Sequence, residues 1–174
     1  NIYTVSKVRP WKYVTIRVMN TDLQYLLSNS LYLVIAYVTF WFIVSRVIKR
    51  NDVADVAWGL GFVTVTIGAA LMTSKTGSLA RLSMFLTTVW GLRLALHIYL
   101  RNRHKTEDFR YAQWRKDWGK WFTLRSYLQV FLLQGLLLFA IALPVTITVG
   151  TPHTVSVSSW VAAGLITWLF GFYF

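Results

Sequence analysis

Cysteine is absent from this 174-residue chain, and proline occurs only three times. Without cysteine there can be no disulfide bond, no thiolate catalysis and no cysteine-based zinc site. Acidic residues are also scarce, with six against 18 basic residues, which gives a net charge of +12. The three histidines (His97, His104 and His153) are scattered, and no E-x-x-H partner accompanies them. We therefore expect no metal site.

Charge is missing from long stretches of the chain. One of them, Ser126 to Gly150, has no charged residue at all, and hydrophobic residues make up 56% of the chain. A helix of about 20 apolar residues crosses the hydrocarbon core of a bilayer. The sequence therefore predicts an integral membrane protein, with membrane lipids as its surroundings and no nucleic-acid partner.

In lipid, the backbone groups of each span must be satisfied internally, and no segment shows the alternation of a barrel strand. We therefore predict an all-α fold, a polytopic transmembrane helix bundle with a single domain. Five spans are expected: Leu23–Val44, Val53–Met72, Leu79–Leu100, Ser126–Val149 and Val155–Phe174.

Both ends of the sequence are unusual. The first methionine is Met19, and residues 1–18 carry four basic residues and no acid. We expect residues 1–18 to be a non-native or disordered leader. The apolar run at the other end reaches Phe174 without a capping residue. We therefore expect residues 19–174 to be the N-terminal part of a single integral-membrane domain.

The distribution of basic residues predicts the topology. Without residues 1–18, two basic residues (Lys75 and Arg81) fall on one side of the membrane and eleven on the other. Short loops rich in Lys and Arg stay in the cytoplasm. The N-terminus is therefore predicted to lie outside, and the loop Arg101–Arg125 in the cytoplasm.

That loop contains an amphipathic pattern. Tyr111, Trp114, Trp118 and Trp121 recur at helical spacing, and the opposite side is polar. The pattern predicts an interfacial helix at the cytoplasmic surface, with its aromatic side toward the lipid. Gly119 should weaken its last turn.

Two carboxylates open the second predicted span. Asp52 and Asp55 share a helix face with Gly59. Either acid could cap the helix, where the helix dipole favours negative charge. Asp55, one turn deeper, is equally a site candidate, because a carboxylate in a span needs a cation, water or a ligand.

A polar stripe runs along the third predicted span through Trp90, Arg93, His97 and Arg101. A guanidinium within a span needs a partner. Two interpretations of Arg93 remain open: a structural pair with Asp55, or an anion-binding group. His97, beside them, is a candidate proton donor.

Several strings together resemble the bacterial membrane proteins of the steroid 5-alpha-reductase-like group. The resemblance covers residues 51–174 and rests on Asp55–Phe62, Trp90–His97, Arg101–Arg103, Glu107–Tyr111, Trp114–Arg115, Trp118–Gly119 and Phe131–Gly135. It implies a multi-helix fold of the inner membrane and NADPH-dependent reduction of a carbon–carbon double bond in a lipid or steroid-like small molecule. In that group a further C-terminal region holds much of the cofactor site, so this fragment is expected to be inactive alone.

The resemblance also assigns roles. Related reductases use an acid on the second helix, a tyrosine on the third and a nearby arginine, which match Asp55, Tyr99 and Arg101, although Tyr99 is offset by one residue. His97 could take the place of the tyrosine, so the catalytic candidates are Asp55, His97 and Tyr99. Arginine side chains at the cytoplasmic end of a helix can bind the phosphate groups of a cofactor. The expected contacts to NADPH are Arg93, Arg101, Arg103, Arg110 and Tyr111.

Two other functions fit the same sequence. One is a membrane methyltransferase that uses S-adenosylmethionine, because such enzymes share a similar C-terminal architecture. The other is a non-catalytic scaffold, in which Arg93 and Asp55 would be a structural pair. The sequence does not define the substrate or the oligomeric state.

Overall fold

The computed structural model describes residues 11–73, 76–151 and 158–173, and every regular element in this part of the chain is helical. The predicted all-α fold class is confirmed. The elements in order are α1 (Trp11–Ile48), α2 (Val53–Leu71), α3 (Ser78–Asn102), α4 (Phe109–Trp118), the 3₁₀ turn η1 (Gly119–Trp121), α5 (Phe122–Arg125), the π-helical segment η2 (Ser126–Leu132), α6 (Leu133–Gly150) and α7 (Ser159–Tyr173).

Four helical segments are long and apolar enough to cross a membrane: Asp22–Ile48, Val53–Leu71, Ser78–Asn102 and Phe109–Gly150. They confirm the first four predicted spans. The fifth corresponds to α7, which has 15 residues and is shorter than the roughly 20 that a span needs. Its predicted residues 155–157 and 174 lie outside the described part of the chain. Helix α1 begins at Trp11, so residues 11–18 are helical, and their status as a leader stays a prediction.

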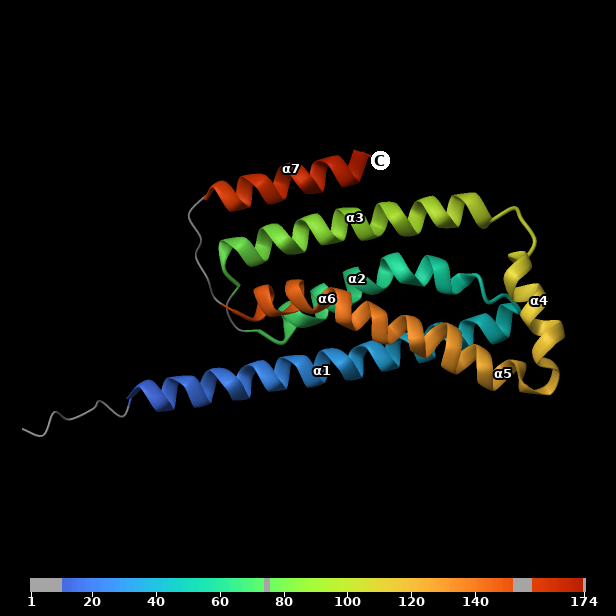
Figure 1. Ribbon diagram of the computed structural model, residues 1–174, viewed down its shortest axis with the longest axis horizontal. Coiled ribbons are helices and arrows are strands. Elements are labelled where there is room, and N and C mark those ends of the chain that lie inside the picture. The colour runs from blue at the N-terminus through green and yellow to red at the C-terminus, as the bar shows by residue number, and fades with distance from the viewer. Residues whose placement is uncertain (1–10, 74–75, 152–157, 174) are drawn as a thin grey trace, which may run out of the picture.

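Helix α2 packs against α1, α3 and α6 (Figure 1). Its glycines allow close approach: a Cβ built on Gly59 would lie 2.6 Å from the carbonyl oxygen of Gly91 on α3. The main core lies between α1, α2 and α6 and includes Val34, Phe62 and Leu138. Lipid is as apolar as these side chains, so close packing rather than the hydrophobic effect holds such helices together.

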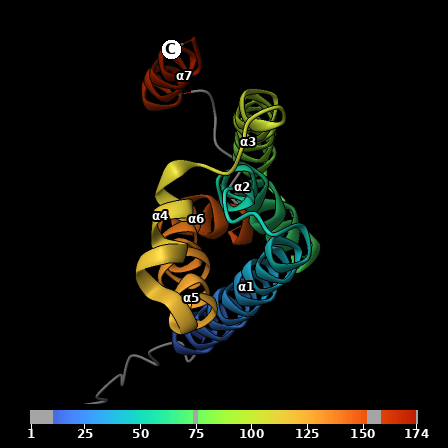
Figure 2. The same ribbon diagram turned by 90° about the vertical axis from the view of Figure 1, so that its right-hand side faces the viewer.

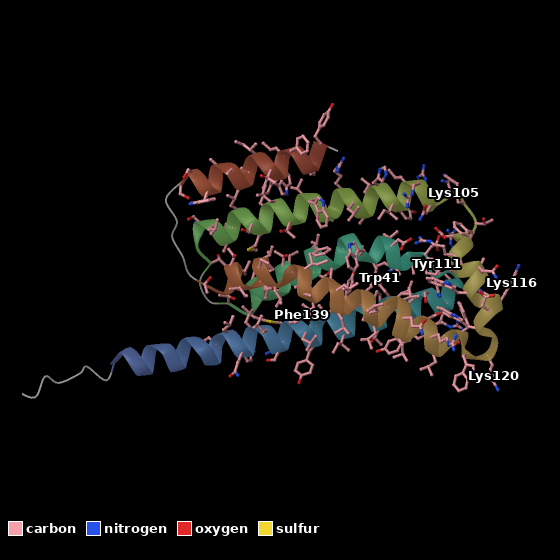
Figure 3. All side chains as sticks on the ribbon, viewed as in Figure 1. Trp41, Lys105, Tyr111, Lys116, Lys120 and Phe139 are labelled. Atoms are coloured by element: carbon pink, nitrogen blue, oxygen red, sulfur yellow. The ribbon has the colours of Figure 1, made fainter. Side chains whose placement is uncertain are left out.

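One end of the bundle collects most of the basic residues, and we call it the basic end, residues 46–52 and 101–126. Helices α1 and α3 finish there, α2 begins there and α4 crosses it (Figure 1). Figure 3 shows Lys105, Lys116 and Lys120 at this end. The chain reverses after α1 because Lys49 has a left-handed conformation with φ of 58°.

The predicted amphipathic helix is present as α4, but its aromatic side faces the core of the bundle and not the lipid. Tyr111 is only 3% exposed, and Trp114 and Trp118 pack against the core and stack on each other. The loop folds α4 back across the end of the bundle (Figure 2). Because Trp114 and Trp118 pack against the core, their rings cover that end instead of facing lipid. Trp121 is 55% exposed. Gly119, with φ of 45°, ends the helix as expected.

Candidate functional site

A partly buried ion pair fixes the turn between α1 and α2. Arg50 donates to both carboxylate oxygens of Asp52, from Nε at 3.0 Å and from an Nη at 2.6 Å. The same guanidinium reaches the carbonyl oxygen of Asn102 at the end of α3, at 3.4 Å. Asp52 occupies the N-cap position of α2, but its side chain makes no capping hydrogen bond. Asp52, predicted to cap α2, instead forms an ion pair with Arg50, and the bond from Arg50 to Asn102 links this turn to α3.

Glu107, in the loop before α4, is the centre of a second network. Its carboxylate accepts the backbone N–H of Asn51 at 2.8 Å and two hydrogen bonds from Arg115 on α4, at 3.0 and 3.1 Å. The Asn51 side chain donates to the Ser126 hydroxyl at 3.0 Å, where η2 begins. Charge-assisted hydrogen bonds of this kind are stronger than those between neutral groups. They hold the basic end together.

Asp55 joins α2 to α4. The Tyr111 hydroxyl donates to Asp55 Oδ1 at 3.2 Å, and a guanidinium nitrogen of Arg110 lies 3.8 Å from Oδ2. Figure 3 shows Tyr111 at the end of α4 that meets α2. Arg110 also binds Asp108, and hydrogen bonds from its side chain and its backbone N–H lower the pKa of Asp108 below the usual value. Arg110 and Tyr111 are therefore engaged by carboxylates.

The predicted contact between Asp55 and Arg93 is wrong. Gly59, one turn after Asp55, is level with Gly91 and Ala95, so Arg93 lies about 6 Å further along the bundle. Arg93 is exposed, and its guanidinium carbon lies 4.7 Å from the centre of the Phe172 ring on α7. Helix α4 supplies the partners of Asp55 instead.

The predicted polar stripe on α3 does not face a common site. Trp90 packs edge-on against Phe62 in the core, whereas Arg93, His97 and Arg101 are exposed. His97 and Tyr99 lie two residues apart, so their side chains leave the helix about 200° apart. The candidates Asp55, His97 and Tyr99 are therefore not gathered around one cavity.

Tyr99 lines a cavity of about 200 Å³ between the α1–α2 turn and the end of α3. Aliphatic side chains (Ile48, Val53 and Val56) form much of its wall, and we call it the polar cavity because charged side chains share that wall. The polar side chains around it are Arg50, Asp52, Tyr99, Asn102 and Arg103. Among the described residues, ion pairs occupy Arg50, Arg110 and Arg115, whereas Arg101 and Arg103 form none. Arg103 is thus an unpaired cation in the wall of this cavity, and Arg101 is close to it in sequence.

A second, apolar cavity of about 300 Å³ lies between α2, α3, α6 and α7. Four aromatic rings line it, those of Phe62, Trp90, Trp168 and Phe172. Polar groups in its wall are sparse, with Thr66 on α2 and Thr87 on α3. A cavity of this size and lining suits a small, lipophilic molecule.

Three features were missed in the sequence. Glu107 and Arg115 were assigned no role of their own, and their spacing of eight across a loop–helix junction carries no recognisable signal. Asn51 is 1% exposed, and its position just before the predicted span was the available indication of a buried role. Thr66 is one of many threonines and gave no indication of its cavity.

Neither the curated proteins nor the solved structures contain a match to this chain. One family model does match, that of DUF1295, described as a protein of unknown function, over residues 41–174. The match covers α2 to α7 and the end of α1, and so includes both cavities and the basic end. The chain therefore belongs to the DUF1295 family.

Proposed function

We propose that this chain forms the membrane-embedded part of a reductase that uses NADPH to reduce a carbon–carbon double bond in a lipid or steroid-like molecule. The family is a steroid 5-alpha-reductase-like group, which supports this class of reaction. The structure adds two cavities, one with the charged side chains of Arg50, Asp52 and Arg103 in its wall and one apolar with aromatic walls. A charged cofactor and a lipophilic substrate need such different surroundings.

The pairing of the arginines is the observation that carries the proposal. Asp52, Asp55 and Glu107 neutralise Arg50, Arg110 and Arg115, respectively. Arg101 and Arg103 stay without an acidic partner within the described residues. Guanidinium groups bind phosphates through charge-assisted, often bidentate hydrogen bonds. Arg101 and Arg103 would therefore hold the phosphates of NADPH.

The size of the polar cavity limits what it can hold. At about 200 Å³ it is smaller than the roughly 300–1,000 Å³ typical of sites for drug-sized ligands. The residues of this chain thus fit one part of the dinucleotide. Arg110 and Tyr111, expected to contact the cofactor, would instead support the site by holding α4 against α2 through Asp55.

The bound nicotinamide would supply the hydride. Tyr99 is the preferred proton donor, because it lines the same polar cavity as Arg103. His97 is the second choice, since it is exposed on another side of α3. In this proposal the basic end faces the cytoplasm, in agreement with the positive-inside rule.

Turnover tests the proposal. The protein expressed from its complete gene would be placed in nanodiscs with NADPH and androst-4-en-3-one, and the products analysed by mass spectrometry. A product richer by two hydrogens is expected, and Tyr99→Phe should slow its formation while cofactor binding persists. A product that carries an added methyl group when S-adenosylmethionine replaces NADPH would establish the methyltransferase alternative. No product from either cofactor would contradict both enzymatic proposals and favour the scaffold.

A further inference from the structure

Phe122, the first residue of α5, contacts two guanidinium groups at the basic end. The centre of its buried ring lies 4.2 Å from the guanidinium carbon of Arg115 on α4 and 5.8 Å from that of Arg46 on α1. Arg115 also donates to the carbonyl oxygen of Lys49, just after α1, at 3.4 Å. An aromatic face attracts cations at such distances. The last turn of α1 is therefore held close to α5.

Three cations around this contact have no acidic partner. Arg46, Lys49 and Lys120 are exposed, and none of them forms an ion pair within the described residues. Asp117, the acid nearest to Lys120 in the sequence, bonds to Gln113. The charge of all three is therefore free to bind an anion from outside the bundle.

Apolar side chains are exposed next to these cations. Ile43 and Val47 lie one turn apart on α1, on the same side of the helix as Arg46. Both belong to a segment long enough to span a membrane, so they lie deeper in the bilayer than the end of α1. Trp121, next to Lys120, is also exposed, and tryptophan is enriched where the membrane meets water. This surface thus has cations at its outer edge and apolar groups beneath them.

A phospholipid has the same order of groups, a charged head above apolar chains. Arginine and lysine near a membrane surface attract anionic lipids, and guanidinium groups bind phosphate through charge-assisted hydrogen bonds. We propose that an anionic phospholipid binds here, with its phosphate between the end of α1 and η1 and its acyl chains along α1. We call this site the lipid surface, and it consists of Ile43, Arg46, Val47, Lys49, Lys120 and Trp121.

The lipid surface is distinct from the polar cavity. The wall of that cavity contains Ile48 and Arg50 but no residue of the lipid surface. The bound lipid is thus neither the cofactor nor the substrate of the proposed reductase, and its binding needs no NADPH.

Other basic residues at this end lie away from the lipid surface. Figure 3 shows Lys120 on the side of α5 and Lys105 on the side of α3. Lys105, in the loop after α3, and Lys116, on α4, are exposed too. A general attraction between the basic end and negative membranes would depend on all these cations alike. A defined site makes binding depend on Arg46 and Lys120 in particular.

The test is a lipid titration of the complete protein in detergent, followed by native mass spectrometry. Phosphatidylglycerol, which is anionic, and phosphatidylcholine, which is zwitterionic, are compared with the same oleoyl chains. The first phosphatidylglycerol molecule should bind more tightly than phosphatidylcholine. Arg46→Gln with Lys120→Gln should weaken phosphatidylglycerol binding roughly tenfold and leave that of phosphatidylcholine nearly unchanged.

The matched control is Lys105→Gln with Lys116→Gln, which removes the same charge from other exposed positions of the basic end. This variant should keep the affinity of the wild type for phosphatidylglycerol. Equal weakening by the two double variants would overturn the site and leave only a general attraction to negative charge. Equal affinity of the wild type for the two lipids would overturn the preference for an anionic head group.

The apolar part of the lipid surface is tested separately. Val47→Ser should weaken phosphatidylglycerol binding roughly threefold, through loss of apolar contact, whereas Leu100→Ser, at an exposed position near the end of α3, should not. Glycerol phosphate carries the anionic group without acyl chains and should not displace the lipid at equal concentration. Displacement by glycerol phosphate, or equal binding by Val47→Ser and Leu100→Ser, would show a phosphate site and contradict a lipid site.

Discussion

The hydroxyl of Tyr111 donates a hydrogen bond to Asp55 across 3.2 Å and so joins α4 to the first turn of α2. The tyrosine is 3% exposed, so water competes little for this contact. It positions α4 over the end of the bundle.

Tyr111→Phe should destabilise the protein by about 1–2 kcal/mol. The substitution leaves a partly buried carboxylate without a hydrogen bond, while Arg110 still offsets its charge. Denaturation in detergent would measure the loss. Tyr99→Phe is the control, because Tyr99 is 53% exposed and should lose little stability. Similar stability of both variants would show that the Tyr111 contact does not hold α4 in place.

Glu107→Gln should destabilise the protein by about 1–3 kcal/mol, because the carboxylate accepts bonds from both Asn51 and Arg115. Asp117→Asn is the matched control, since Asp117 is exposed and bonds only to Gln113 within the described residues. A double-mutant cycle of Glu107→Gln with Arg115→Gln should give a coupling energy clearly above zero. Additive losses would mean that the two side chains do not interact.

The basic end shows how far the sequence could define this structure. The four long spans were predictable because their length and hydropathy are set by the bilayer, and the second began at Val53 as expected. The partner of Asp55 was not predictable, because the residues on one face of a helix do not show which other helix packs against that face. The loop brings Tyr111 and Arg110 to Asp55, and this long-range contact carries no sequence signal.

The candidate site was predictable only in part. Arg103 and Tyr99 do lie at one cavity, as the position of both near the end of α3 suggested. The apolar cavity depends on where α7 lies relative to α2, α3 and α6, which periodicity cannot provide; Figure 2 shows α7 set apart from the other helices. Arg93 was expected near Asp55 but contacts Phe172, because it projects from a different side of α3 than Gly91 and Ala95 do.

Gly91→Ala should destabilise the contact between α2 and α3 by about 1–3 kcal/mol. The new Cβ would lie 2.6 Å from the Gly59 carbonyl oxygen, so the two backbones would have to separate. Gly164→Ala, where a Cβ meets no atom within 4 Å, should be neutral or slightly stabilising. Thermal unfolding of both variants would compare them. A Gly91→Ala protein as stable as wild type would contradict the close packing.

Orientation can be tested with single cysteines, because the chain has none of its own. With the basic end in the cytoplasm, a membrane-impermeant thiol reagent should label Thr76→Cys in intact cells. Lys105→Cys should react only after the membrane is permeabilised. The reverse pattern would show that the basic end faces outward.

The most direct test of the central claim is a calorimetric titration of the complete protein with NADPH. Binding is expected in detergent and in nanodiscs. Replacing Arg101 and Arg103 together by alanine should weaken it roughly ten- to hundredfold, through loss of charged hydrogen bonds. The control, Lys116→Ala with Lys120→Ala, removes the same charge from α4 and η1, and its affinity should stay near that of wild type. Absence of NADPH binding in both media, or equal weakening by both double variants, would contradict a cofactor site at Arg101 and Arg103.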